Sequence, residues 1–154
     1  RLNMKILMVC LGNICRSPLA EGILRAKVNS RGLDIKVDSA GTGGWHIGQG
    51  PDPRAIDIAN KYGIDISQQQ ARQFSSTDFE DFDIIYAMDD SNLSDIVSLA
   101  NSNKDLEKVQ LILNEINPED NTPVPDPYYG GDDGFEKVYQ LLDAACEIII
   151  KKIS

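Results

Sequence analysis

Cys10 and Arg16 are the residues of this sequence whose types and spacing suggest phosphate chemistry. The segment that contains them reads Cys10-Leu11-Gly12-Asn13-Ile14-Cys15-Arg16-Ser17. A strand that passes into a helix through a loop with Gly and Asn aims several backbone N–H groups and the helix N-terminus at one point. Such a point binds an anion, and the amides and Arg16 both favour the thiolate form of a neighbouring cysteine. The segment therefore predicts an oxyanion site in which Cys10 is a nucleophile that needs no histidine base.

The same residues allow a simpler interpretation. A cysteine at the end of a strand is often only a small buried hydrophobic residue. A cysteine and an arginine six positions apart carry little information alone, whereas Gly, Asn, Ser and Pro at the bend, with a strand before it, make a strong signal. We therefore favour phosphate binding.

The elements around this segment must hold it in place. Residues 4–9 form a short apolar run, which is typical of a buried parallel strand. The residues after Arg16 predict a helix, with Ser17 as its N-cap, Pro18 at its first position and Gly32 just past its end. The loop thus joins a buried strand to the start of a helix.

The rest of the chain alternates strands and helices. Further strands are expected at residues 33–39, 83–88 and 108–113, and further helices from Asp52, from Asp90 or Ser91, and over 135–153. Residues 117–134, which are rich in proline, predict a long ordered loop. This pattern predicts one α/β domain over residues 1–154, with a doubly wound parallel sheet and a ligand crevice at the carboxyl ends of the strands.

Composition argues against several classes of function. The net charge of −9 makes nucleic acids and anionic membranes poor partners. A single histidine, His46, argues against Cys/His and Ser/His/Asp hydrolases and against His-rich zinc sites. The three cysteines, two of them at positions 10 and 15, and the absence of an apolar run of about 20 residues favour a cytoplasmic protein. We expect no metal and no other cofactor.

Several segments resemble those of a known family. Residues Cys10 to Pro18 are similar to the phosphate-binding loop of the low-molecular-weight protein tyrosine phosphatases, and residues 126–129 resemble their general-acid loop. Residues 38–42 and 87–92 also resemble family segments. The similarity covers residues 4–153, and residues 1–3 are expected to be a remnant of protein expression. The resemblance implies a four-stranded parallel sheet in the order 2-1-3-4, flanked by helices.

The resemblance also implies a metal-independent phosphotyrosine phosphatase that works through a cysteinyl-phosphate. Cys10 would attack phosphorus, Arg16 would clamp the phosphate, and Asp126 would protonate the leaving phenolate and then activate water. The phosphate-binding loop would consist of Leu11, Gly12, Asn13, Ile14, Cys15 and Ser17. Asp-Pro pairs are also common turn formers, so the catalytic interpretation of Asp126 depends on the loop at Cys10 and on the tyrosine pair after it.

Other residues are expected to line or support this site. The expected pocket residues are Ile14, Trp45, Tyr128 and Tyr129, and the expected supporting residues are Ser39 and Asp89. Ser17 would hydrogen-bond the Cys10 sulfur, or only cap the helix. Trp45 could instead pack as a lid, and Asp89 could be only a turn or cap residue.

Two expectations come from the family pattern alone. Cys15 would form a reversible disulfide with Cys10 that protects the nucleophile, unless it is only a packed side chain. The family usually has a histidine near Gln68 or Gln69 that supports the phosphate loop, and this chain has glutamine there.

Alternative functions make different demands on the sequence. A thioredoxin-coupled arsenate reductase needs further cysteines, but residues 16–145 contain none. A phosphoarginine phosphatase typically has threonine where this chain has Ile14. A phosphocarrier or a catalytically silent phosphotyrosine-binding module would not need both Arg16 and Asp126. The expected partners are phosphotyrosine proteins or small aryl phosphates, with a tyrosine kinase as antagonist, and the chain is expected to be a monomer or to self-associate weakly.

Overall fold

A parallel sheet lies at the centre of the structure, a computed structural model that describes residues 3–128 and 132–154. Within these residues the sheet has four strands, in the order β2-β1-β3-β4. The strands are β1 (Met4–Cys10), β2 (Ile35–Gly41), β3 (Ile84–Ala87) and β4 (Val109–Leu111). Each neighbouring pair is parallel. The predicted fold class and the strand order implied by the family resemblance are therefore confirmed.

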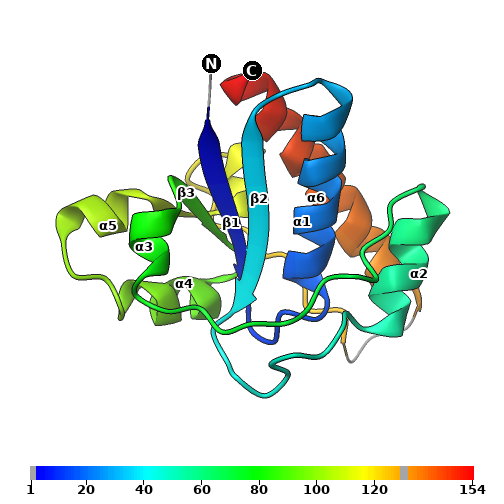
Figure 1. The fold of residues 1–154 in the computed structure, drawn as a ribbon, viewed down its shortest axis with the longest axis horizontal. Helices are drawn as coiled ribbons and strands as arrows, with labels where there is room; N and C mark the ends of the chain where they lie inside the picture. Colours follow the sequence, from blue (N-terminus) through cyan, green and yellow to red (C-terminus); the bar gives the residue numbers. More distant parts are fainter. Residues whose placement is uncertain (1–2, 129–131) are drawn as a thin grey trace.

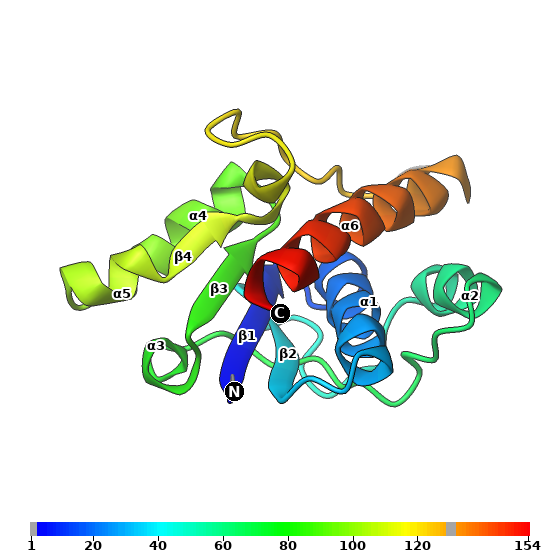
Figure 2. The ribbon, with the colours of Figure 1, turned by 90° about the horizontal axis from the view of Figure 1, so that it is seen from above.

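Helices cover both faces of the sheet (Figure 1). One side carries α1 (Arg16–Ser30), α2 (Pro53–Lys61) and α6 (Asp132–Ile153). The other side carries α3 (Asp78–Asp81), α4 (Asp90–Val97) and α5 (Asn103–Glu107). Figure 2 shows the sheet from above, between these two groups of helices. Such double coverage explains why β1 and β3 read as apolar runs, whereas the edge strand β2 begins with alternating apolar and polar residues.

The central strand β1 divides the core into two parts. Its residues Ile6, Leu7, Met8 and Val9 have no exposed surface. Ile6 and Met8 belong to the core cluster formed with α1 and α6, whereas Leu7 and Val9 belong to the cluster on the other face. Because β1 is held from both faces, its carboxyl end at Cys10 is a fixed point for the loop that follows.

Two expected helix caps differ from the structure. Helix α1 begins at Arg16 with Cys15 at the N-cap, so the prediction of Ser17 as N-cap is wrong and its hydroxyl faces the loop instead. Asp89, and neither Asp90 nor Ser91, caps α4 through a hydrogen bond from the Asn92 N–H. Cys15 makes no side-chain cap hydrogen bond, whereas the Asp89 carboxylate accepts from one of the N–H groups that the start of a helix leaves free.

The end of the fourth strand also differs from the prediction. The chain leaves β4 after Leu111 and continues as the 3₁₀ helix η1 (Ile112–Glu115), which buries Ile112 and Leu113. Apolar residues in a run this short fit a strand or a helical turn equally well. Helices α3 and α5 were not expected, because elements of four and five residues are too short to show a period. The helix expected from Asp52 is confirmed, with Asp52 as its cap.

Replacing Ile149 by alanine is expected to destabilise the fold by about 2–5 kcal/mol, because the side chain is fully buried and its removal leaves a cavity. Ile148 is the next residue on α6 and is 36% exposed, so Ile148→Ala is the matched control and should cost much less. Urea unfolding of both variants measures the difference. Equal losses would contradict the burial of residue 149 in the core.

Candidate active site

The loop at residues 11–15 lies at the carboxyl edge of the sheet, between β1 and α1. Asn13 has a φ of 57°, in the left-handed region that asparagine tolerates better than most residues. The loop also packs directly on the end of β2, where a Cβ at Gly41 would come within 2.8 Å of the Leu11 carbonyl oxygen. Tight curling and this close approach give the loop one defined shape.

The sulfur of Cys10 lies at the centre of the curled loop. The Asn13 backbone N–H donates to it at 3.3 Å, and the Ser17 hydroxyl oxygen lies 3.0 Å from it. Although Cys10 is only 3% exposed, it lines a cavity at this edge of the sheet. Donors that point at the sulfur stabilise a negative charge on it. The hydroxyl of Ser17, which was expected either to bond the sulfur or to cap the helix, therefore bonds the sulfur.

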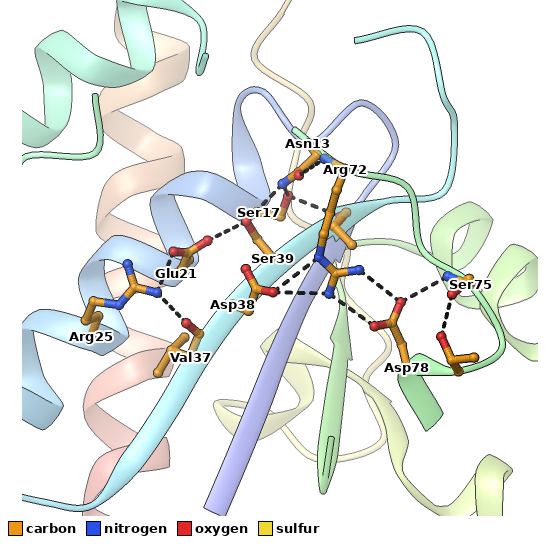
Figure 3. A network of polar contacts seen from close by, with 12 residues as sticks. Asn13, Ser17, Glu21, Arg25, Val37, Asp38, Ser39, Arg72, Ser75 and Asp78 are labelled. Carbon is orange, nitrogen blue, oxygen red and sulfur yellow. Dashed lines mark hydrogen bonds and ion pairs between the residues drawn. The ribbon is translucent and has the colours of Figure 1, made fainter. Parts of the chain in front are cut away.

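The hydrogen bonds of Asn13 fix the direction in which the neighbouring hydroxyls donate (Figure 3). Its Oδ1 accepts from the Arg72 backbone N–H at 3.1 Å, so its Nδ2 faces Ser17 at 2.8 Å and Ser39 at 3.0 Å. The oxygen of Ser17 thus accepts from Asn13 and keeps its proton for another acceptor. At 3.0 Å the Cys10 sulfur is nearer to it than the Ala40 carbonyl oxygen, which lies 3.5 Å away.

Glu21 closes the inner end of this network, a role that its sequence position in the first helix did not suggest. The Ser39 hydroxyl donates to Glu21 Oε1 at 2.5 Å, and Arg25 lies 2.7 Å from its other oxygen. Burial raises the pKa of the Glu21 carboxyl, while Ser39 and Arg25 oppose that rise. Arg25 also donates to the Val37 carbonyl, which ties α1 to β2.

Arg16 is buried with its charge paired. Its Nη1 donates to Asp89 Oδ2 at 2.7 Å and to the Val124 carbonyl oxygen at 3.0 Å. Its Nη2 lies 3.8 Å from Asp126 Oδ2. Asp89 follows β3 and also caps α4, so it is a cap residue and an Arg16 partner at once. Two separate segments, the start of α4 at Asp89 and the loop at residues 124–126, therefore determine where the guanidinium points.

One cavity of about 340 Å³ opens at this edge of the sheet. Its lining residues are Cys10, Leu11, Gly12, Ile14, Cys15, Arg16, Trp45, His46, Asp126 and Tyr128. Asp126 thus lines the same cavity as Cys10 and Arg16, although it lies more than 100 residues away in the sequence. Trp45 keeps 69% of its surface exposed, so it stands at the cavity mouth and does not pack as a lid on the core.

The structure places the remaining expected residues as follows. Ser39 lies behind the loop, outside the cavity lining. Tyr129 lies outside the described residues. Gln69 donates to the Pro18 carbonyl oxygen at 3.1 Å, whereas Gln68 is exposed, so Gln69 is the residue that reaches α1. His46 was not expected at the site, although its place next to Trp45 in the sequence was a usable signal.

Within residues 3–128 and 132–154, no three His, Cys, Asp or Glu side chains gather as a group that could hold a metal ion. No helix in this part of the chain is both long and apolar enough to cross a membrane. The charged side chains that line the cavity are those of Arg16 and Asp126.

Comparisons with known proteins agree with this geometry. A family model described as "Low molecular weight phosphotyrosine protein phosphatase" matches residues 5–154. A Schizosaccharomyces pombe protein of that description is 46% identical over 145 residues, which cover 92% of each chain. A solved protein tyrosine phosphatase from Entamoeba histolytica superposes with a TM-score of 0.90 at 38% identity, over 97% of this chain and 96% of the other. A Drosophila arginine phosphatase superposes with a TM-score of 0.87 at 37% identity, over 97% of each chain.

At about pH 8, iodoacetamide is expected to modify Cys10 much faster than Cys15, because only the thiolate reacts. Burial, followed by the charges of Asp52 and Cys10, raises the pKa of Cys15 to about 12. Cys15 therefore stays a thiol until the pH approaches that value, and its labelling should rise only there. Mass spectrometry of the labelled peptides measures both rates, with the denatured chain as the control in which they converge. Equal rates in the folded protein would contradict this assignment.

Proposed function

The chain belongs to the low molecular weight phosphotyrosine protein phosphatase family, and on that basis we propose that it hydrolyses phosphotyrosine through a cysteinyl-phosphate intermediate. The observation that supports this mechanism most is that Cys10, Arg16 and Asp126 line one cavity. A nucleophile, a phosphate clamp and a proton donor are the three groups that the two-step reaction needs.

In the first step, the Cys10 thiolate attacks phosphorus. The sulfur–phosphorus bond forms as the bond between phosphorus and the tyrosine oxygen breaks, and Asp126 gives its proton to that oxygen. Arg16 and the loop N–H groups hold the remaining phosphate oxygens, where each well-aimed donor contributes about 3–4 kcal/mol to the transition state. Arginine suits this position because its planar fork can bind two oxygens at once.

In the second step, water attacks the cysteinyl-phosphate. Asp126, now a carboxylate, takes a proton from the water while the water oxygen forms a bond to phosphorus. The sulfur–phosphorus bond breaks, and the sulfur leaves as a thiolate that receives the hydrogen bond of Ser17. The products are inorganic phosphate and the free enzyme.

The side chains that wall the cavity favour an aryl phosphate. Ile14, Trp45 and Tyr128 give the cavity apolar walls, which suit a phenyl ring. Phosphoarginine is the second candidate, because a solved arginine phosphatase resembles this chain over 97% of its length. Turnover of phosphotyrosine and phosphoarginine peptides of matched sequence separates the two. Preference for phosphoarginine would reject the substrate class and leave the cysteinyl-phosphate mechanism in place.

The cellular setting is also part of the proposal. The substrates are phosphotyrosine proteins or small aryl phosphates, and a tyrosine kinase would be the opposing enzyme. We place the protein in the cytoplasm, where its three free cysteines fit a reducing environment. We expect it to act as a monomer or a weakly associating chain.

Cys10→Ser is expected to abolish release of phosphate from p-nitrophenyl phosphate, because a hydroxyl cannot replace the thiolate at neutral pH. The wild-type rate should not change in excess chelator. Cys146→Ala, which removes a buried cysteine outside the cavity lining, is the control and should keep the activity. A chelator-sensitive rate, or full activity of Cys10→Ser, would overturn the proposed mechanism.

Asp126→Ala is expected to slow turnover of phenyl phosphate by about 10²–10⁴-fold, because phenolate leaves poorly without a proton. The loss should be much smaller for p-nitrophenyl phosphate in a single turnover, since nitrophenolate leaves without protonation. Asp120→Ala is the matched control, because Asp120 is an exposed carboxylate of the same segment that lies outside the cavity lining and accepts from the Thr122 hydroxyl at 2.5 Å. Equal losses on both substrates would contradict the general-acid role.

A further inference from the structure

A polar cluster behind the phosphate loop contains Arg72, Asp38 and Asp78 (Figure 3), and none of these three residues lines the cavity. Arg72 donates from Nε to Asp38 Oδ2 at 3.2 Å, and its Nη1 and Nη2 donate to the two oxygens of Asp78 at 3.2 and 3.1 Å. Asp38 lies on β2 and Asp78 begins α3. One guanidinium therefore joins a strand and a helix that flank the segment in which it lies.

The Arg72–Asp78 pair is the charged contact that explains the burial of Asp78. The Asp78 side chain is only 5% exposed, and it also accepts from the Ser75 N–H at 3.0 Å. A buried carboxylate needs a paired charge or several donors to offset its lost hydration. Breaking the pair would therefore cost much free energy, which points to a role in holding the surrounding segments together.

The backbone of residue 72 makes the contact that matters for the site. Its N–H donates to Asn13 Oδ1 at 3.1 Å, while its carbonyl oxygen accepts from the Gly41 N–H at 2.9 Å. An N–H can only donate, so it allows only the carbonyl oxygen of the Asn13 amide to face it. This contact decides the orientation of the Asn13 amide.

A reversed Asn13 amide would change the hydrogen bonds at the nucleophile. Its oxygen would then face the hydroxyls of Ser17 and Ser39, which Nδ2 now faces at 2.8 and 3.0 Å. Ser17 could donate to that oxygen instead of to the Cys10 sulfur. The thiolate would lose one of the two donors described around it.

From this geometry we propose that Arg72 is a positioning residue of the active site. Its ion pairs with Asp38 and Asp78 hold the residue-72 N–H against Asn13, and that N–H directs the Ser17 proton towards the Cys10 sulfur. The expected effect on kcat rests on the proposed phosphatase function. The expected effect on the reactivity of the Cys10 sulfur is independent of that function.

The test combines Arg72→Met with Asp78→Asn, because removing the arginine alone would leave a buried carboxylate unpaired. The pH profile of Cys10 alkylation by iodoacetamide is measured by mass spectrometry, next to kcat and KM for p-nitrophenyl phosphate. The loss of one hydrogen bond to a charged group predicts that alkylation below the midpoint pH falls about tenfold. The midpoint should move up, and kcat should fall with little change in KM, because Arg16 keeps its own partners.

Arg72→Lys is the second variant. Lysine keeps a positive charge beside Asp78 but lacks the planar fork that reaches Asp38 as well. The expected alkylation profile lies between those of the wild type and the double variant. If the double variant fails to fold, Arg72→Lys carries the test, and a wild-type midpoint in this folded variant would overturn the proposal.

The matched control is Arg31→Met with Glu147→Gln. This pair is also an arginine–carboxylate contact, at 2.8 Å, but it lies past the carboxyl end of α1, at the opposite end from the loop. It should leave the alkylation profile unchanged. A folded Arg72→Met/Asp78→Asn variant with the control's profile would reject the proposal. A shifted profile in a protein without phosphatase activity would support it and reject the proposed function instead.

Discussion

Burial of the Arg16 guanidinium with its charge is the constraint on which the site depends. A buried positive charge needs a paired charge and hydrogen-bond acceptors, and the Asp89 carboxylate and the Val124 carbonyl both accept from Nη1 of Arg16. Asp89 follows β3, and Val124 lies two residues before Asp126. The contacts that hold Arg16 therefore also bring the segment of Asp126 to the loop at Cys10.

The charge of the whole chain opposes the charge of the proposed ligand, so binding has to be local. A net charge of −9 repels a phosphate dianion at long range, whereas Arg16 and the loop N–H groups act within a few ångströms. The positive end of α1 lies at the same place, because the helix begins at Arg16. The same acidity would limit the binding of other anions elsewhere on the surface.

The loop keeps its shape because its polar groups are matched from behind. The side-chain oxygen of Asn13 accepts one hydrogen bond, and its amide nitrogen donates to Ser17 and to Ser39. The Ser39 hydroxyl in turn donates to Glu21. The Ser39 hydroxyl accepts from Asn13 and donates to Glu21, so a change at one position alters the others. The hydrogen bonds around the Cys10 sulfur thus depend on residues outside the cavity lining.

The sequence alone determined the local part of this protein. Cys10, Asn13, Arg16 and Ser17 lie within eight residues, so a strand, a turn and a helix start already bring them together. The apolar runs at 4–9 and 83–88 identified buried strands for the same reason, because burial on two faces leaves a continuous signal. Only the tertiary structure decided the pairs Arg16–Asp89, Asn13–Arg72 and Ser39–Glu21, and the place of His46 in the cavity. These contacts join segments far apart in the chain, and the geometry of the packed sheet and helices, which no local pattern encodes, sets their distances.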